Sequence, residues 1–529
     1  MRHFMKKINN PILKGFNPDP SIIRVGNDFY IATSTFEWLP GIPIYHSTDL
    51  IHWKLISHVF SGNPPFNLRG VVDSAGLWAP SLSYHDGVFW VVYTVVHNRL
   101  GNFKDVHNYL VTSPDIHGPW SEPVRLNSSG FDPSLFHDSD GRKWLLNIQW
   151  DFRLNHPRFG GIVLQEYDSQ KNSLIGSPSI ILKKKQLIEG PNLYFYNGYY
   201  YLMLAEGGTS WTHAISMARS KNMLGPYECD PQSVLLTSYD NEELALQKAG
   251  HGEIVQLASG EWYLAHLASR PLGKGEKRRC ILGRETCLQR VEWSPDQWLR
   301  LSQGGNHPDI EIPVSDTLKE SPSSEFFVRD DFDLPKLDLC WCTLRVPCED
   351  FWVNLSERPS YLRLRGRESM QSLYEQNLVA KRLQSFQCVV ETCIEFEPQH
   401  FSQMAGLICW YDTKTHYYLR VTHDEIKGKI LGIIFSDDGV YGEIEDSLLV
   451  VQDWERIYLR AQIDRDNLQF TVSKNESDWI KIGPVLEMSK LSDDYGKGLH
   501  FTGTFVGLCA QDLNGTRAIA DFDYFLITY

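Results

Sequence analysis

Short alternating runs of apolar and polar residues, each preceded by a turn, recur through residues 10–302. In residues 189–201 a polar knot with Gly and Pro precedes an apolar residue, a turn and an aromatic-rich run. Four other units open in the same way, and the aligned first positions are Asp19, Ala79, Asp132, Gly190 and His251, which are 60, 53, 58 and 61 residues apart. A period of two indicates strands, and helical periodicity is scarce, so the pattern predicts an all-β chain.

A repeat of this length, built from short strands and turns, is typical of a radial array. Each copy is long enough for one four-stranded blade, so five copies predict a five-bladed β-propeller over residues 1–305. A β-sandwich with similar hairpins is the alternative, but it gives no reason for even spacing. In a propeller the innermost strand of each blade begins beside the central axis. We therefore expect the five aligned positions to converge.

The pattern changes after residue 305. Residues 306–325 are polar and lack a sustained period, which predicts a linker. Alternating runs return over residues 326–529 without the knot, separated by turns such as Asp437-Asp438-Gly439. These features predict an antiparallel β-sandwich as the second domain.

Composition and charge narrow the class of protein. The net charge of −14 disfavours nucleic acid or an anionic membrane as a partner. Neither an apolar run long enough to span a bilayer nor an evident signal peptide is present in the sequence. The ten cysteines are scattered, and Cys340 and Cys342 lack a second pair at metal-binding spacing. We expect reduced thiols in a cytoplasmic protein and predict no metal site.

Three carboxylates fall on or beside the converging positions. Asp19 and Asp132 occupy aligned positions, and Glu189 stands one residue ahead of its own. Two carboxyl groups, one donating a proton and the other activating water, cut glycosidic bonds. A third nearby raises the pKa of the donor by like-charge repulsion. The alternative is that the Asp-Pro-Ser knots are only turns that start strands, which explains Asp19 and Asp132 well and Glu189 poorly. Three carboxylates on one axis favour a site.

Other residues near the knots are candidates for contacts with a sugar. We expect Trp78 to face the pocket as a platform for a sugar ring, with a buried blade tryptophan as the alternative, and Phe36 has the same two interpretations. The guanidinium of Arg284 is suited to donate hydrogen bonds to two hydroxyls of one sugar; a structural or surface ion pair is the alternative. His251 fits three roles: orienting a carboxylate, holding a central ion through water, or being a hydrogen-bonded core histidine.

These motifs resemble family 43 of the glycoside hydrolases. The stretch Gly15–Ile22 is similar to the opening motif of the family, Phe131–Ser134 to its second acidic motif and Ile188–Pro191 to its third. The resemblance implies that Asp19 is the general base and Glu189 the general acid. It implies that Asp132 modulates the pKa of the acid and orients it.

Within the family the chain is most similar to two-domain β-xylosidases. That likeness lies in residues 32–38, 205–209, 282–286, 330–333 and 501–507, and so covers nearly the whole chain. One departure is Cys342, where an asparagine is expected, far from the site motifs. The implied substrate-binding residues are Phe36, Trp78, Thr209, His251, Arg284 and Phe505. By this resemblance Phe505 reaches the pocket from the second domain, whereas we expect Phe501 in the sandwich core.

The predicted function is an inverting, exo-acting β-D-xylosidase that releases xylose from the non-reducing ends of xylo-oligosaccharides in xylan degradation. An α-L-arabinofuranosidase, or an enzyme with both activities, is the alternative within the same chemistry. A non-catalytic sugar-binding propeller is the alternative of another class, but it would not need the carboxylate trio. We expect no cofactor to be required. A structural Ca²⁺ near the axis and a homo-oligomeric state stay open.

Overall fold

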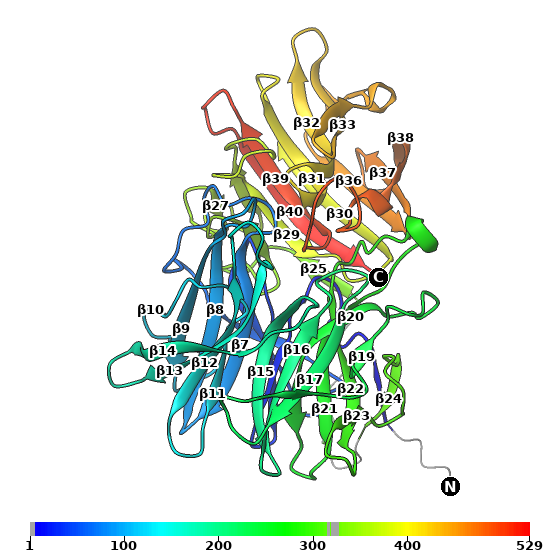
Figure 1. Ribbon diagram of the computed structural model, residues 1–529. Coiled ribbons are helices and arrows are strands. Elements are labelled where there is room, and N and C mark those ends of the chain that lie inside the picture. Colours follow the sequence, from blue (N-terminus) through cyan, green and yellow to red (C-terminus); the bar gives the residue numbers. More distant parts are fainter. Residues whose placement is uncertain (1–5, 315–317, 319–326) are drawn as a thin grey trace.

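The computed structural model describes residues 6–314, 318 and 327–529 and comprises two domains, one above the other in Figure 1. The lower domain carries five sheets in a radial arrangement, and the upper domain two larger packed sheets. Apart from three short 3₁₀ helices, the regular elements in the described ranges are strands. No helix among those residues is long and apolar enough to cross a membrane. The predicted all-β fold, a five-bladed propeller followed by a sandwich, is confirmed.

Each blade is an antiparallel meander. Blade 1 contains β2 (Ser21–Val25), β3 (Asp28–Ala32), β5 (Gly41–Ser47) and β6 (Lys54–Phe60). Blade 2 contains β7 (Gly76–His85), β8 (Val88–Asn98), β9 (Asp105–Ser113) and β10 (Val124–Arg125). Blade 3 contains β11 (Ser134–His137), β12 (Lys143–Trp150), β13 (Phe159–Asp168) and β14 (Ser173–Leu182).

Blades 4 and 5 follow the same plan. Blade 4 contains β15 (Ile188–Tyr196), β16 (Tyr199–Glu206), β17 (Ala214–Ser220), β18 (Glu228–Cys229) and β19 (Leu236–Thr237). Blade 5 contains β20 (Gln247–Gln256), β21 (Trp262–Ser269), β22 (Glu285–Trp293) and β23 (Leu299–Leu301), with the 3₁₀ helix η1 (Gly275–Lys277) before β22. The first strands of neighbouring blades contact one another in the closed order β2, β7, β11, β15, β20. The start of every repeat therefore lies beside the axis.

The chain ahead of blade 1 closes the ring by running along blade 5. Leu13 bridges to Thr286 of β22, and β1 (Lys7–Asn9) pairs with β24 (Glu311–Pro313). Residues 311–313 of the predicted linker, residues 306–325, therefore form a strand that pairs with the chain ahead of blade 1. Three residues are too few to show a period in the sequence, although Ile312 is buried.

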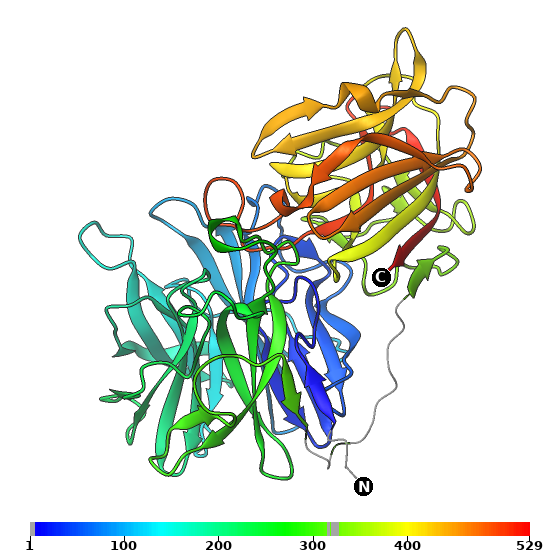
Figure 2. The same cartoon turned by 90° about the vertical axis from the view of Figure 1, so that its right-hand side faces the viewer.

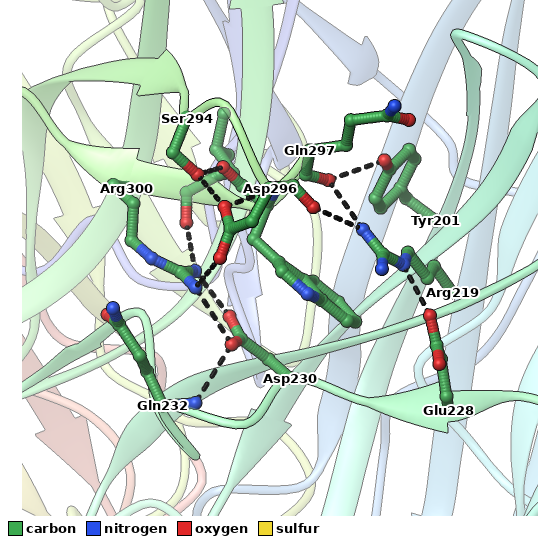
Figure 3. A network of polar contacts seen from close by, with 11 residues as sticks. Tyr201, Arg219, Glu228, Asp230, Gln232, Ser294, Asp296, Gln297 and Arg300 are labelled. Atoms are coloured by element: carbon green, nitrogen blue, oxygen red, sulfur yellow. Dashed lines mark hydrogen bonds and ion pairs between the residues drawn. The ribbon is translucent and has the colours of Figure 1, made fainter.

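Polar contacts join the outer strands of blades 4 and 5 (Figure 3). Arg300 forms a two-pronged ion pair with Asp230, with N–O distances of 2.5 and 3.0 Å. Tyr201 donates a hydrogen bond to the Gln297 carbonyl at 2.5 Å, and Arg219 donates to the same oxygen at 3.1 Å. Such paired groups hold the two blades together away from the axis.

The second domain is a sandwich of two antiparallel sheets. One contains β25 (Phe327–Asp330), β27 (Val353–Asn354), β28 (Leu362–Arg365), β30 (Gln387–Phe396), β36 (Ile457–Asp464), β37 (Asn467–Ser473), β38 (Ile480–Glu487) and β40 (Ile519–Thr528). The other contains β26 (Cys342–Leu344), β29 (Leu378–Arg382), β31 (Gln403–Asp412), β32 (Thr415–Asp424), β33 (Gly428–Asp437), β34 (Val440–Glu443), β35 (Leu449–Val450) and β39 (Phe505–Asp512). Short 3₁₀ helices are η2 (Glu445–Ser447) and η3 (Met488–Lys490).

The two domains share one sheet. The short strand β4 (Trp38–Leu39) leaves blade 1 and pairs with β26 at the edge of a sandwich sheet. Beside it the buried Arg345 of the sandwich donates hydrogen bonds to Asp73 Oδ1 at 2.7 Å and to the Val71 carbonyl at 2.8 Å. Figure 2 shows the sandwich seated on one end of the propeller, with the orange-red loop ahead of β39 reaching that end. The second domain is thus docked where the blades begin.

Candidate active site

The five aligned positions share one unusual backbone conformation. Asp19, Ala79, Asp132, Gly190 and His251 all have positive φ, at 53, 37, 53, 54 and 40°. Non-glycine residues rarely adopt this region, so its recurrence confirms the alignment of the repeats. All five line one pocket on the axis. The convergence expected from the sequence is therefore present.

Asp19 is held by three donors. Ser34 donates to its Oδ2 at 2.7 Å, Arg284 Nη1 donates to its Oδ1 at 2.8 Å, and His251 Nδ1 lies 3.3 Å from Oδ1. Burial would raise the pKa of Asp19, but the charge of Arg284 and the hydrogen bonds from His251 and Ser34 hold it well below its usual range. Asp19 is therefore an ionised, oriented carboxylate.

Glu189 is perturbed in the opposite direction. Burial, followed by the charge of Asp132, raises its pKa to about 8. Burial also raises the pKa of Asp132 to about 6, and its Oδ2 accepts a hydrogen bond from the Gly190 N–H at 3.2 Å. Asp132 thus binds the backbone directly after Glu189. At neutral pH this arrangement holds a protonated carboxyl group near an ionised one, as acid–base chemistry requires.

His251 packs against the third acidic motif. A side chain at Gly190 would place its Cβ 2.8 Å from His251 Nε2, so only glycine fits between them. Burial would lower the pKa of His251, but its hydrogen bond to Asp19 and the surrounding carboxylates raise it to about 9. Of the roles left open for His251, the structure supports orientation of a carboxylate.

Arg284 directly precedes β22 and is 2 % exposed. Besides Asp19, it donates from Nη2 to the Phe501 carbonyl at 2.9 Å, and its guanidinium carbon lies 5.4 Å from the centre of the Phe36 ring. Its buried Nε has no hydrogen-bond partner among the described residues. Of the interpretations of Arg284, the structure therefore shows the ion pair, which is formed with Asp19 and is buried. Contact of Arg284 with sugar hydroxyls stays a prediction.

Three aromatic rings from both domains meet beside the carboxylates. Phe36 and Trp78 lie 5.8 Å apart between ring centres, and Phe501 of the sandwich lies 6.1 Å from Phe36 and 5.8 Å from Trp78. Trp78 Nε1 donates to the Ser74 carbonyl at 3.1 Å, which fixes the ring. Phe36 and Trp78 thus pack together, and the third ring comes from the second domain. Their contact with a sugar stays a prediction.

The expectation for the second-domain aromatic was wrong in its choice of residue. Phe505 is fully buried, with its ring stacked on Trp38 at 3.7 Å, so it belongs to the interface core and not to the pocket. Phe501, expected in the core, takes the pocket position. Gly503 explains the exchange, because its Cβ position lies 2.8 Å from the Leu282 carbonyl, where the chain turns from the pocket into β39. The unbroken apolar run after Phe505 was the available signal for a buried strand.

Two further groups near the site were missed. Ser34 links two knots, since its Oγ also accepts the Ala79 N–H at 2.7 Å. Lys104 lies over Trp150 at 4.4 Å, and burial lowers its pKa to about 8 while the charge of Glu189 opposes that shift. Thr209 lies partly exposed between β16 and β17, and within the described chain no hydrogen bond joins it to the three carboxylates.

Among the residues that the structure describes, one cluster could hold a metal ion by its composition: Cys280, Asp493 and Asp494. Lys248 Nζ already lies 3.2 Å from Asp493 and 2.6 Å from Asp494. The lysine thus supplies the positive charge that the two carboxylates require.

Comparisons with known proteins agree with this geometry. Residues 8–299 match the family described as glycosyl hydrolases family 43, and residues 329–528 match the β-xylosidase C-terminal concanavalin A-like domain. The chain is 45 % identical to a protein named β-xylosidase from Bacillus subtilis, over 98 % of this chain and 99 % of that one. It is 44 % identical to a xylosidase/arabinosidase from Humicola insolens, over 99 and 98 %. Among solved structures, the xylan β-1,4-xylosidase from Bacillus halodurans is 51 % identical, with a TM-score of 0.96 over 99 % of this chain and 100 % of that one.

Proposed function

Because the chain belongs to family 43 of the glycosyl hydrolases, we propose that it is an inverting, exo-acting β-D-xylosidase. The observation that carries the proposal is the opposite perturbation of two carboxyl groups beside one pocket. The pKa of Asp19 is held well below its usual range, whereas the pKa of Glu189 is raised to about 8. A base that is ionised and an acid that is protonated at the same pH are what hydrolysis of a glycoside needs.

In the proposed reaction Glu189 donates its proton to the glycosidic oxygen as the bond to the anomeric carbon breaks. A water molecule attacks that carbon from the opposite face and gives up a proton to Asp19. A carboxylate with so low a pKa is a weak base, but the transition state resembles an oxocarbenium ion, so the water needs little deprotonation before the bond has broken. The hydrogen bonds from Ser34 and Arg284 fix the carboxylate that orients this water.

Asp132 has two proposed roles. Its charge is the second cause, after burial, of the raised pKa of Glu189. Its hydrogen bond from the Gly190 N–H fixes the backbone that carries the acid. Neither role requires contact with the sugar.

The proposed exo action follows from the wall made by Phe36, Trp78 and Phe501. Five blade mouths around an axis would otherwise leave an open bowl suited to internal cleavage. The sandwich covers one side, and aromatic faces pack well on the C–H faces of a terminal sugar. Substrate chains then enter with the non-reducing end first, as proposed for xylo-oligosaccharides.

The remaining proposals concern the surroundings of the reaction. Acid, base and water suffice for the chemistry, so we propose that no cofactor is required. The ten cysteines carry no disulfide, which supports a reducing, cytoplasmic compartment. A net charge of −14 supports a neutral sugar rather than a nucleic acid as partner.

A second candidate activity is the hydrolysis of α-L-arabinofuranosides, favoured by the likeness to a protein named xylosidase/arabinosidase. Initial rates on an aryl β-D-xyloside and an aryl α-L-arabinofuranoside separate the two. We expect the xyloside to be cleaved faster, and the Asp19→Ala variant to cleave neither. A faster arabinofuranoside would reverse the order of the proposals, and binding without cleavage of either would replace both with a sugar-binding protein.

A further inference from the structure

The loop that brings Phe501 to the pocket is fastened to the propeller at several points. We call residues 491–504, between η3 and β39, the strap. The Phe501 N–H donates to Ser74 Oγ at 3.1 Å, and its carbonyl accepts from Arg284 at 2.9 Å. At the far end of the strap, the Thr504 N–H donates to the Ile281 carbonyl at 3.0 Å. These bonds lie in the last four residues of the strap.

The first part of the strap is held by a buried ion cluster. Lys248 of β20 lies 3.2 Å from Asp493 and 2.6 Å from Asp494, and the three side chains are 3, 3 and 8 % exposed. Asp494 also accepts the Cys280 N–H at 2.9 Å. Two adjacent buried carboxylates require a counter-charge, because an uncompensated buried charge is strongly unfavourable. Lys248 is that charge, and it comes from the other domain.

The backbone at Lys248 is shaped to deliver this side chain. Its φ is 54°, a conformation that costs free energy in a non-glycine residue. The pairing of β20 with β21 shifts register between Gln247 and Gly250, so the strand bulges at this point. Lys248 precedes His251 by three residues on this strand. The same distorted segment therefore serves the axis and the strap.

Packing alone does not hold this part of the strap. A cavity of about 540 Å³ separates residues 493–498 from the propeller loop at residues 275–279, with Trp211 also in its wall. The strap contains Gly496 and Gly498, both with positive φ, in the same stretch. A strap released from Lys248 thus has space and backbone freedom to move.

The docking of the two domains depends on other contacts. β4 joins the sandwich sheet through Trp38 and Leu39, and Arg345 binds Asp73. Loss of the charge at Lys248 would leave those contacts in place.

We propose that Lys248 is a positioning residue for the pocket. Its ion pairs with Asp493 and Asp494 fasten the strap across the domain interface. The strap in turn holds the Phe501 ring over the bound sugar and the Phe501 carbonyl against Arg284. This inference rests on the proposed function, since it assigns the lysine to a pocket for terminal xylose. Lys248 acts through the strap and does not itself contact the sugar.

The test compares Lys248→Met and Lys248→Arg with Lys429→Met. Lys429 is also a buried lysine, paired with Glu397, but it lies at the opposite end of β33 from Asp437, which accepts a hydrogen bond from Tyr495 of the strap. Its loss therefore reports destabilisation of the sandwich alone. Amide hydrogen exchange over residues 491–504 and the kinetics of xylobiose hydrolysis are measured for each variant.

We expect Lys248→Met to speed exchange in the strap by about tenfold or more while exchange in β4 and β26 is unchanged, as local opening predicts. KM for xylobiose should rise about tenfold, the factor given by a loss of about 1.4 kcal/mol, with a smaller change in kcat. Lys248→Arg should restore most of both. Introduced together with Phe501→Ala, Lys248→Met should raise KM less than it does alone, because the two act through one contact.

Strap exchange and KM that match those of Lys429→Met would overturn the positioning role. If Lys248→Met does not fold, Asp494→Asn retains one ion pair and should give smaller changes of the same sign; unchanged strap exchange in that variant would equally overturn it. Failure of the proposed function would give a different result, because the parent enzyme would not cleave xylobiose. Hydrogen exchange would still decide whether Lys248 fastens the strap.

Discussion

The Arg284 guanidinium lies 2.8 Å from Asp19 Oδ1, with 2 and 7 % of the two side chains exposed. This buried ion pair separates the two proposed catalytic carboxyl groups in acidity. The pKa of Asp19 is held well below its usual range, whereas burial and Asp132 raise the pKa of Glu189 to about 8. The predicted pH window of activity is therefore bounded on its alkaline side by Glu189 and not on its acid side by Asp19.

Arg284→Met should introduce a limit on the acid side of the pH profile. Without the arginine, burial raises the pKa of Asp19, and because the base must be ionised, the acid limb of kcat/KM moves to higher pH. Activity at the optimum should fall about 10²-fold or more, since the carboxylate also loses its orientation. Arg270→Met is the matched control, because Arg270 pairs with the adjacent Glu285 outside the trio. An unchanged acid limb in Arg284→Met would show that the arginine does not set the charge of Asp19.

Glu189→Ala should separate substrates by leaving group. Xylobiose needs a proton on its departing oxygen, so its kcat/KM should fall about 10³-fold, whereas an aryl xyloside with an acidic phenol should lose far less. Glu253→Gln is the control, a buried glutamate that accepts hydrogen bonds from Ser21 and Ile22 near the same axis. Equal losses on both substrates in Glu189→Ala would assign the acid to another residue.

Asp132→Asn should shift the alkaline limb. The acid is active when protonated, so activity is lost as pH rises through its pKa. Removing the charge of Asp132 lowers that pKa from about 8, and the alkaline limb should move to lower pH. Asp138→Asn, a buried aspartate in the same blade, should leave the limb where it is.

Phe501→Ala and Phe505→Ala should have different consequences. The Phe501 ring packs beside Phe36 and Trp78, so its loss should leave the melting temperature nearly unchanged and raise KM for short oligosaccharides several-fold. Phe505 stacks on Trp38 in the interface core, and its removal should cost about 3–5 kcal/mol of unfolding free energy. Thermal unfolding and initial rates on xylobiose check both. The reverse pattern would return Phe505 to the pocket.

The site residues that belong to the repeated motif could be predicted from the sequence, whereas those placed by contacts between distant segments could not. The knots at Asp19, Asp132 and His251 were found because five copies of one backbone conformation require similar residues at similar spacing. Phe501 was misplaced because its position depends on Gly503 approaching the propeller backbone, a contact between domains that no local pattern records. Lys104 lies outside every knot, and β4 is only two residues long. Their placement is set by packing between distant segments.

The partners of Asp19 illustrate the same division. Its pairing with Arg284 joins positions 265 residues apart, and the sequence left three interpretations of that arginine open. The buried ion pair forms because blade 5 lies beside blade 1 in the closed ring, where the chain ahead of Asp19 runs along β22. Ring closure is a property of all five blades together and is not encoded at either residue.

The central claim is that Asp19 directs water to the face of the sugar opposite Glu189. This predicts a separation of ~6.5–9.5 Å between the two carboxyl groups, which leaves room for that water, rather than ~5–5.5 Å. Proton NMR during the first turnovers of an aryl β-D-xyloside, whose one sugar product is the xylose from the cleaved bond, tests the claim most directly. We expect the anomeric signal of α-xylose to appear first and β-xylose to follow only by mutarotation. Initial formation of β-xylose would contradict the account.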